Sequence, residues 1–182
     1  MNQSLISKII EIGKLLWDKG LVTGFNGNIS ARVDADSLLI TATGTCLGYL
    51  KPQDILLMKT SGEVIGDGQA STERLMHTEI YKSYPNIQCV VHTHPTYTNG
   101  FFLANTAFTP RTFEAKFYLG EVHSIEQTTP SVTDMVPVLK ELAANNILVL
   151  RNHGVVSIGK DLFEAFVLIQ ELEEQVSLKK LN

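Results

Sequence analysis

Cysteine is scarce in this sequence, with only Cys46 and Cys89 among 182 residues. Two cysteines do not make a disulfide framework, so we expect a reducing, cytoplasmic setting. Long apolar runs are also missing. Because no stretch of 18 apolar residues occurs, no membrane span is expected. The N-terminus lacks the charged and apolar blocks of a signal peptide, so none is expected. The 15 Lys and Arg residues are outnumbered by 19 Asp and Glu residues. Because they form no basic stripe, no nucleic-acid partner is expected.

Internal repeats and low-complexity linkers are absent as well, so we expect a single domain over residues 1–182. The strands and helices mix without strict βαβ alternation, which favours a largely antiparallel or mixed sheet with helices on its faces. The helices are expected over residues 4–18, 73–84, 95–103, 113–119, 132–145 and 162–180. The strands are expected over residues 29–33, 37–41, 55–59, 63–65, 89–91, 121–124, 147–150 and 155–158. The N-caps expected for the helices at 73 and 132 are Ser71 or Thr72, and Ser131.

A pair of histidines, His92 and His94, follows the apolar strand that begins at Cys89. Side chains at positions i and i+2 of a strand project from the same face, so the two imidazoles lie side by side where the strand ends. Two interpretations stay open for the pair alone: a metal site, or two hydrogen-bonded polar histidines.

A third histidine, His153, occurs in a comparable setting, directly after the apolar strand over residues 147–150. Catalytic zinc sites often use three protein ligands and leave one position open. The three histidines together therefore favour a metal site. His123 is the contrast, because nothing in its local sequence marks it as a ligand.

Glu73 is the candidate carboxylate beside such a metal. In the first turn of a helix it is favoured by the helix dipole alone, which needs no function; the functional alternative is a general base. His77 lies four residues further on the same helix face. A hydrogen-bonded helix pair with Glu73 is the favoured interpretation for His77, and a ligand pair is the alternative.

Three loops rich in Gly, Ser, Thr and Asn surround Gly27-Asn28, Thr43-Gly44 and Ser71-Thr72. Each could present backbone N–H groups and hydroxyls to an anion, and the last sits at a helix N-terminus. Individually each loop is also an ordinary turn, and spacing alone does not show that the three converge.

Taken together, these residues resemble the class II aldolase/adducin family, of the L-fuculose-phosphate aldolase type. The resemblance covers almost the whole chain and rests on five motifs in order: Gly27-Asn28-Ile29-Ser30, Ile40-Thr41 with Thr43-Gly44, Ser71-Thr72-Glu73 with His77, Val91-His92-Thr93-His94, and Asn152-His153-Gly154. It implies a three-layer α/β/α sandwich with a central, mostly antiparallel nine-stranded sheet. It also implies a homotetramer with active sites at the subunit interfaces.

The resemblance further implies a role for each matched residue. It makes Glu73 the catalytic carboxylate, and it assigns zinc to His92, His94 and His153 and the substrate phosphate to Asn28, Thr43, Gly44, Ser71 and Thr72. The implied activity is a zinc-dependent aldolase that cleaves a small ketose 1-phosphate to dihydroxyacetone phosphate and an aldehyde through a metal-stabilised enediolate. Another divalent transition metal would also suit imidazole ligands.

One departure concerns the acid that acts on the aldehyde. Fuculose-phosphate aldolases carry a tyrosine about twenty residues beyond the histidine pair, where this chain has Glu114, with Tyr118 four residues on. Glu114 is therefore the second candidate catalytic residue, beside Glu73. An acidic residue there is similar to the family's pentulose-phosphate 4-epimerases and its dehydratases, although the dehydratases lack an acid at the Glu73 position. The alternative of another class is a non-catalytic, adducin-like scaffold, a branch that tends to lose the metal histidines.

Overall fold

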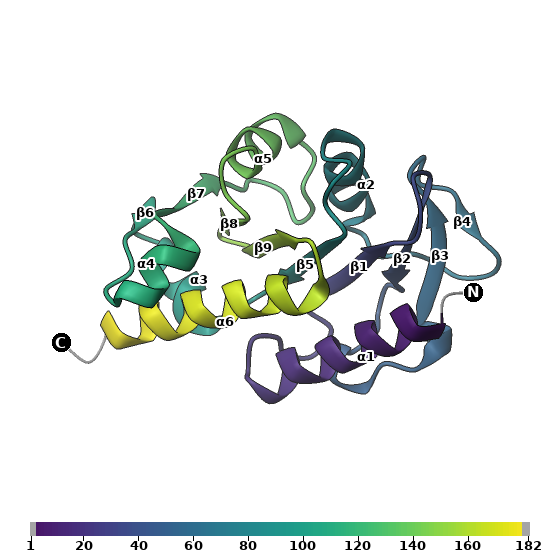
Figure 1. The fold of residues 1–182 in the computed structure, drawn as a ribbon, viewed down its shortest axis with the longest axis horizontal. Helices are drawn as coiled ribbons and strands as arrows, with labels where there is room; N and C mark the ends of the chain where they lie inside the picture. Colours follow the sequence, from purple (N-terminus) through teal and green to yellow (C-terminus); the bar gives the residue numbers. More distant parts are fainter. Residues whose placement is uncertain (1–2, 180–182) are drawn as a thin grey trace.

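A computed structural model describes residues 3–179, which form one mixed α/β structure (Figure 1). The helices are α1 (Gln3–Asp18), α2 (Arg74–Ser83), α3 (Thr96–Phe102), α4 (Phe113–Leu119), α5 (Met135–Leu142), α6 (Leu162–Lys179) and the short 3-10 helices η1 (Leu47–Tyr49) and η2 (Pro52–Asp54). The strands are β1 (Asn28–Arg32), β2 (Ser37–Thr41), β3 (Ile55–Lys59), β4 (Val64–Ile65), β5 (Cys89–Thr93), β6 (Ala107–Phe108), β7 (Val122–Glu126), β8 (Ile147–Arg151) and β9 (Gly154–Gly159).

All these strands belong to one nine-stranded sheet, in the order β4-β3-β2-β1-β5-β9-β8-β7-β6. Neighbouring strands are antiparallel except β7 and β8, which run parallel. A parallel pair needs a crossover connection, and α5 lies on the chain between these two strands. The sheet is therefore mixed but mostly antiparallel, which confirms the predicted fold class.

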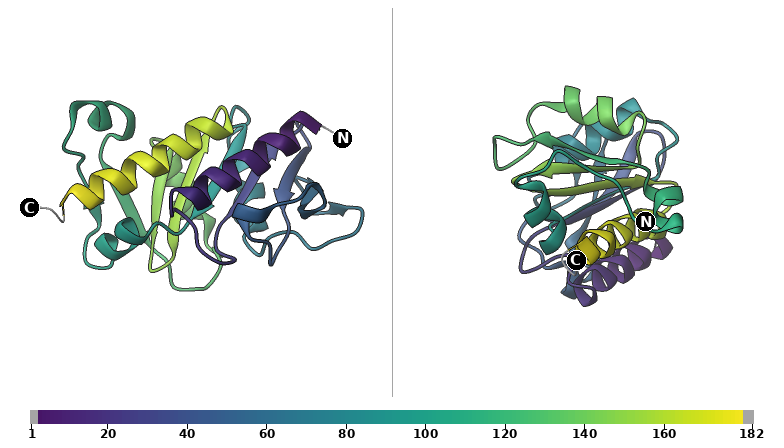
Figure 2. Two further views of the ribbon diagram at one scale, coloured as in Figure 1. Left: turned by 90° about the horizontal axis from the view of Figure 1, so that it is seen from below. Right: turned by 90° about the vertical axis from the view of Figure 1, so that its left-hand side faces the viewer.

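Helices cover both faces of the sheet and produce the three expected layers. α1, α3, α4 and α6 pack on one face, whereas α2 and α5 pack on the other (Figure 1 and Figure 2). Successive strand residues alternate between the two faces. Val91 thus belongs to the core beneath α1 and α6, and its neighbour Val90 packs with Met76 and Ile80 of α2.

Several candidate site residues lie at one edge of the sheet, where the central strands end. β5 runs antiparallel to both β1 and β9, so its C-terminal end lies beside the starts of those two strands. The register places Asn28 directly opposite His92, and His92 opposite Val156. The short connection from β8 to β9, which carries His153, is at the same edge.

The start of the predicted helix over residues 132–145 is wrong. α5 begins at Met135, and Asp134 rather than Ser131 caps it by accepting a hydrogen bond from the Val136 N–H at 3.0 Å. The segment before Asp134 is engaged elsewhere, because the N–H of Val132 donates to a side chain outside α5.

α2 likewise begins one residue later than predicted. Glu73 occupies its N-cap position, and neither Ser71 nor Thr72 does. The hydroxyl of Ser71 instead accepts a hydrogen bond from the backbone N–H of Glu73 at 3.2 Å, which shapes the turn just before the helix.

Other differences lie at the ends of several elements, such as α5, which ends at Leu142 rather than at residue 145, at short elements and at the chain end. β6, η1 and η2 have too few residues to show a periodic pattern and were not predicted. The last residue of the helix expected over 162–180 lies outside the described residues. Among residues 3–179, no helix combines the length and the apolar character needed to span a membrane.

Candidate active site

Three histidine rings converge at the sheet edge defined above. His92 is in β5, His94 directly follows that strand, and His153 lies between β8 and β9. The Nε2 atom of His92 is 2.9 Å from the Nε2 of His153 and 3.0 Å from the Nε2 of His94. The structure therefore brings together the three residues predicted as metal ligands, which are called the histidine cluster below.

The second nitrogen of His92 fixes the orientation of its ring. The Nδ1–H of His92 donates to the carbonyl of Val155 at 3.0 Å, which leaves the lone pair of Nε2 directed at the other two rings. Burial, reinforced by His94 and His153, holds the pKa of His92 well below its usual value. Burial also lowers the pKa of His94 to about 4 and lowers the pKa of His153. All three rings are neutral near pH 7, which is the form that binds a metal ion.

This donor set fits a divalent transition metal. The three ligand nitrogens lie within 4.8 Å of one another, and they border a cavity, so a fourth position would be open to substrate. Imidazole ligands suit zinc and several neighbouring metals, and the geometry does not choose among them.

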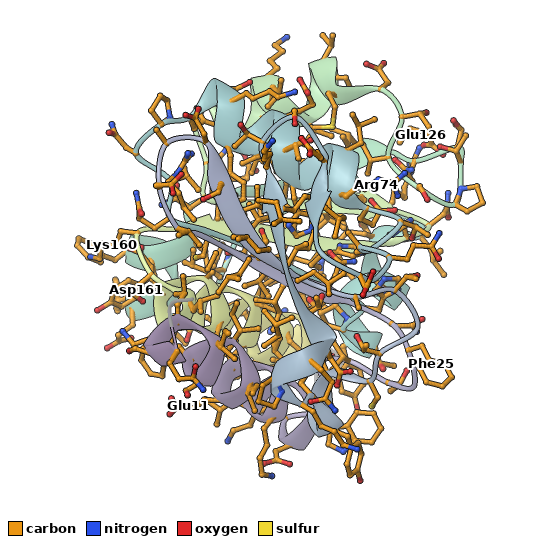
Figure 3. The ribbon with its side chains drawn as sticks, turned by 90° about the vertical axis from the view of Figure 1, so that its right-hand side faces the viewer. Glu11, Phe25, Arg74, Glu126, Lys160 and Asp161 are labelled. Carbon is orange, nitrogen blue, oxygen red and sulfur yellow. The ribbon has the colours of Figure 1, made fainter. Side chains whose placement is uncertain are left out.

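The turn that carries His153 is anchored on both sides. The Nδ2 of Asn152, a residue with φ +66°, donates to Oε1 of Glu126 at 3.4 Å. The Nδ2 of Asn99, in α3, donates to the His153 carbonyl at 3.3 Å. Glu126 lies on the same edge of the molecule as Phe25, on the opposite side from Lys160 and Asp161 (Figure 3). These contacts hold the third imidazole against a strand end that is distant in sequence.

Two glycines permit the close approach of backbone to the cluster. A Cβ at Gly154 would lie 2.3 Å from the carbonyl oxygen of Thr93 and 2.9 Å from the His92 ring. A Cβ at Gly27 would lie 2.8 Å from the carbonyl oxygen of His92, and the φ of Gly27, +85°, also favours glycine. The glycines of the motifs Gly27-Asn28 and His153-Gly154 are thus required by the packing of the site.

Glu73 lies at the start of α2 and is buried, with 4% of its surface exposed. Its Oε2 accepts a hydrogen bond from the Val132 N–H at 3.3 Å. Burial raises the pKa of Glu73, while hydrogen bonds from Val132 and Ser131 partly offset that rise. A raised pKa makes this carboxylate a stronger proton acceptor than an exposed one, which suits a general base.

A cavity of about 180 Å³ connects the histidine cluster, Glu73 and the three polar loops. Every predicted site residue except Glu114 lines it, so the three loops do converge. The lining residues are Phe25, Asn26, Gly27, Asn28, Ala42, Thr43, Gly44, Thr45, Ser71, Thr72, Glu73, His92, His94, Pro130 and His153.

Hydroxyl, amide and backbone groups dominate the loop side of this cavity, and the lining contains neither Lys nor Arg among the described residues. The loop containing Thr43 is tied to the segment before α2 by the hydrogen bond from its N–H to the Gln69 carbonyl at 2.9 Å. The Ser71 N–H donates to the Thr41 carbonyl at 3.2 Å. An anion here would meet neutral donors and the positive end of α2, which is a common environment for a phosphate.

Glu114 is the predicted site residue that lies elsewhere. It is exposed in the first turn of α4, which packs on α6 at the far end of the sheet from β4. Burial, with the charges of Glu174 and Glu114, raises the pKa of Glu171 in α6. Neither Glu114 nor Tyr118 reaches the cavity within one chain.

Sequence reasoning did not single out Phe25, Asn26, Ala42, Thr45 or Pro130 of the lining, and it assigned one wrong partner. Phe25 is 74% exposed at the cavity rim, and its signal was an aromatic residue inside a glycine-rich loop. Pro130 lies in a segment without a readable pattern. The ring of His77 does not pair with the Glu73 side chain but hydrogen-bonds to Ser30 and to Asn28 instead.

Comparisons with known proteins bear on the family and the fold of this chain. The family model for the class II aldolase and adducin N-terminal domain matches residues 7–179. The L-fuculose phosphate aldolase of Methanococcus vannielii is 32% identical over 177 residues, which cover 97% of this chain and 94% of that protein. The 3-oxo-tetronate 4-phosphate decarboxylase of Escherichia coli O6:H1 is 33% identical, with 98% and 87% covered. The crystal structure of L-fuculose-1-phosphate aldolase from Thermus thermophilus superposes with a TM-score of 0.88 at 28% identity, covering 99% and 95% of the two chains.

Proposed function

The chain belongs to the class II aldolase and adducin family, and from this premise we propose that it is a zinc-dependent aldolase. Its substrate would be a small ketose 1-phosphate, cleaved to dihydroxyacetone phosphate and an aldehyde. The observation that carries the proposal is the single cavity that joins three converging imidazoles, a buried carboxyl and a set of neutral anion donors.

The residues at the two ends of the cavity would have different roles. Zinc held by the histidine cluster would act as a Lewis acid on the substrate carbonyl and stabilise the negative charge that develops there. Glu73, with its raised pKa, would deliver the proton to the carbon freed by cleavage. The loops around Asn28, Thr43 and Ser71 would bind the phosphate and so hold the reacting carbons in place.

The same cleavage also needs a group that takes the hydroxyl proton of the aldehyde half. Among the described residues of one chain, Glu73 is the one acidic side chain in the cavity lining. We propose that Glu114 of a neighbouring copy supplies this group in a homotetramer of single-domain chains. The exposed aromatic rings of α4 support that assembly, since Phe113 and Phe117 are 87% and 84% exposed and lie beside Glu114.

A second candidate reaction is decarboxylation of a 3-oxo acid 4-phosphate. It is favoured because Glu73 is the one acidic side chain among the described residues that line the cavity. Loss of CO2 breaks the bond between the carboxyl carbon and C2, and the electron pair moves into an enediolate with the C3 carbonyl. Protonation at C2 then yields dihydroxyacetone phosphate. No aldehyde hydroxyl proton has to be removed, so this reaction needs one acidic residue, and Glu73 would supply it.

The test is a product screen with the zinc-loaded full-length protein. Ketose 1-phosphates and 3-oxo acid phosphates would be offered in turn, and dihydroxyacetone phosphate would be measured by NADH-coupled reduction. Triose phosphate with an aldehyde supports the aldolase, triose phosphate with CO2 supports the decarboxylase, and an unsplit epimer supports a pentulose-phosphate 4-epimerase. A zinc-loaded protein that leaves every compound unchanged, or a protein that takes up no divalent metal, would favour the scaffold.

A further inference from the structure

A chain of four buried polar side chains runs from the interior of the protein to the cavity wall. The hydroxyl of Tyr81 is 2.8 Å from Oγ of Ser30, and that Oγ is 2.6 Å from Nδ1 of His77. The Nε2 of His77 is 2.5 Å from Oδ1 of Asn28. Tyr81 and His77 come from α2, while Ser30 and Asn28 come from β1. Among the four, Asn28 alone lines the cavity.

The direction of these hydrogen bonds follows from counting hydrogens. His77 is completely buried, and burial lowers its pKa to about 3, so its ring is neutral and carries one N–H. Tyr81 and Ser30 each carry one hydroxyl hydrogen. Three hydrogens therefore serve three hydrogen bonds if Tyr81 donates to Ser30, Ser30 donates to Nδ1 of His77, and Nε2–H donates to Asn28.

The opposite direction leaves one buried hydrogen-bond donor without an acceptor. If the amide of Asn28 donated to His77, and His77 donated to Ser30, then the Ser30 hydroxyl would donate to Tyr81. The hydroxyl hydrogen of Tyr81, a residue only 2% exposed, would then lack an acceptor among the described residues of this chain. An unsatisfied buried donor is costly, so the first direction is the favoured one.

The first direction determines how Asn28 faces the cavity. Its Oδ1 accepts from His77, so its Nδ2 amino group, with two hydrogens, is left for a ligand. Asn28 lies directly opposite His92 in the β1–β5 register, next to the histidine cluster. A rotation of the carboxamide by a half turn would instead present an oxygen, which repels an anion.

We propose that His77 is a positioning residue that holds the carboxamide of Asn28 with its amino group toward the substrate phosphate, and that Ser30, by donating to Nδ1, selects the tautomer of His77 that does so. The inference rests on the proposed phosphate site. It gives His77 a task distinct from metal binding and from proton transfer, since the ring hydrogen bonds of His77 among the described residues go to Ser30 and Asn28.

The first test measures affinity for inorganic phosphate by titration calorimetry on the zinc-loaded full-length protein. His77→Leu should weaken phosphate binding by about 10- to 100-fold, since a hydrogen bond to a charged group becomes misdirected. KM for a phosphorylated substrate should rise more than kcat falls, and zinc stoichiometry should stay unchanged. His77→Gln should restore affinity to near the wild-type value, because the glutamine amide can donate to Asn28 from about the same place.

The Asn28→Ala variant and the wild-type protein separate this inference from the proposed function. Asn28→Ala should lose phosphate affinity as His77→Leu does. A loss in Asn28→Ala without any loss in His77→Leu would overturn the positioning role and leave the phosphate site intact. Wild-type protein without measurable phosphate affinity would overturn the phosphate site and the inference with it.

The second test needs no variant that disturbs the fold. Long-range ¹H–¹⁵N correlation of the wild-type protein reports which nitrogen of His77 carries the hydrogen, and the expected answer is Nε2. An Nδ1–H tautomer would overturn the inference. Tyr81→Phe is the matched control, because Ser30 can still donate to His77 and the tautomer should not change.

Discussion

Two regions of this sheet use histidine in opposite ways. In the histidine cluster, burial lowers the pKa of each ring, the neighbouring rings lower the pKa of His92 and His94 further, and the three ligand nitrogens lie within 4.8 Å of one another. On β7, the Nδ1 of His123 lies 2.8 Å from Glu141 and its Nε2 lies 3.2 Å from Glu121. These two carboxylates, Glu141 first, raise the pKa of His123. The difference teaches that a histidine is a ligand candidate where burial keeps its ring neutral, and not where neighbouring carboxylates favour its protonated form.

Removal of a cluster residue should have the largest effect. In His153→Ala, three protein ligands become two, so we expect zinc affinity to fall by more than the roughly 10- to 100-fold typical of a lost supporting hydrogen bond, with activity abolished. Zinc content and a competitive chelator titration measure this. His123→Ala is the control and should keep full zinc stoichiometry. Equal metal loss in the two variants would remove the distinction between the two regions.

Substitution of Glu73 tests whether the buried carboxyl belongs to the chemistry of the cluster. Glu73→Gln preserves shape and removes the titrating proton, so we expect kcat to fall by about 10²- to 10⁴-fold while zinc binding is retained. Glu79 lies on the same helix, where it forms a surface ion pair with Lys82, and Glu79→Gln should be neutral. Full turnover in Glu73→Gln would reduce Glu73 to a helix-terminus residue.

The close backbone approach at the cluster can be tested with a single methyl group. Gly154→Ala introduces a Cβ that would collide with the Thr93 carbonyl and the His92 ring, so we expect a loss of about 1–3 kcal/mol in stability and weaker zinc binding. Gly100→Ala is the matched control in α3, where a Cβ meets nothing within 4 Å, and it should be neutral or stabilising by about 0.5–1 kcal/mol. Thermal unfolding with and without zinc measures both. A Gly154→Ala variant as stable as Gly100→Ala would contradict the packing argument.

The sheet and the histidine cluster could be predicted because their signals are local. Apolar runs marked β2, β3, β5, β8 and β9, and the i, i+2 spacing placed His92 and His94 on one face. The four residues between the apolar strands expected over 147–150 and 155–158 were enough to place His153 at a strand end. The structure supplies what spacing leaves open, namely that these strand ends lie at one edge of the sheet.

The partners of single side chains could not be predicted, because they depend on contacts between distant segments. His77 and Ser30 are 47 residues apart in sequence, and the Val132 N–H reaches Glu73 across 59 residues. The second contact also explains why the helix near residue 132 starts late, since that segment bends toward the cavity. Glu114 shows the same limit: sequence order suggested a site residue, and one chain places it on the outer surface of α4.

The smallest effect should come from His123, and its dependence on pH has a definite sign. The folded-state pKa of His123 is raised above the unfolded value of about 6.5, so its ion pairs stabilise the fold fully below that value and lose this contribution as pH rises through the folded-state pKa. The His123 side chain is 42% exposed, which limits the contribution to at most about 1 kcal/mol. His123→Gln should therefore differ from wild type in denaturant unfolding at about pH 6 and match it at about pH 9. A difference that grows toward high pH would mean that the ring is held neutral in the fold, as the cluster rings are, and would erase the contrast between the two regions.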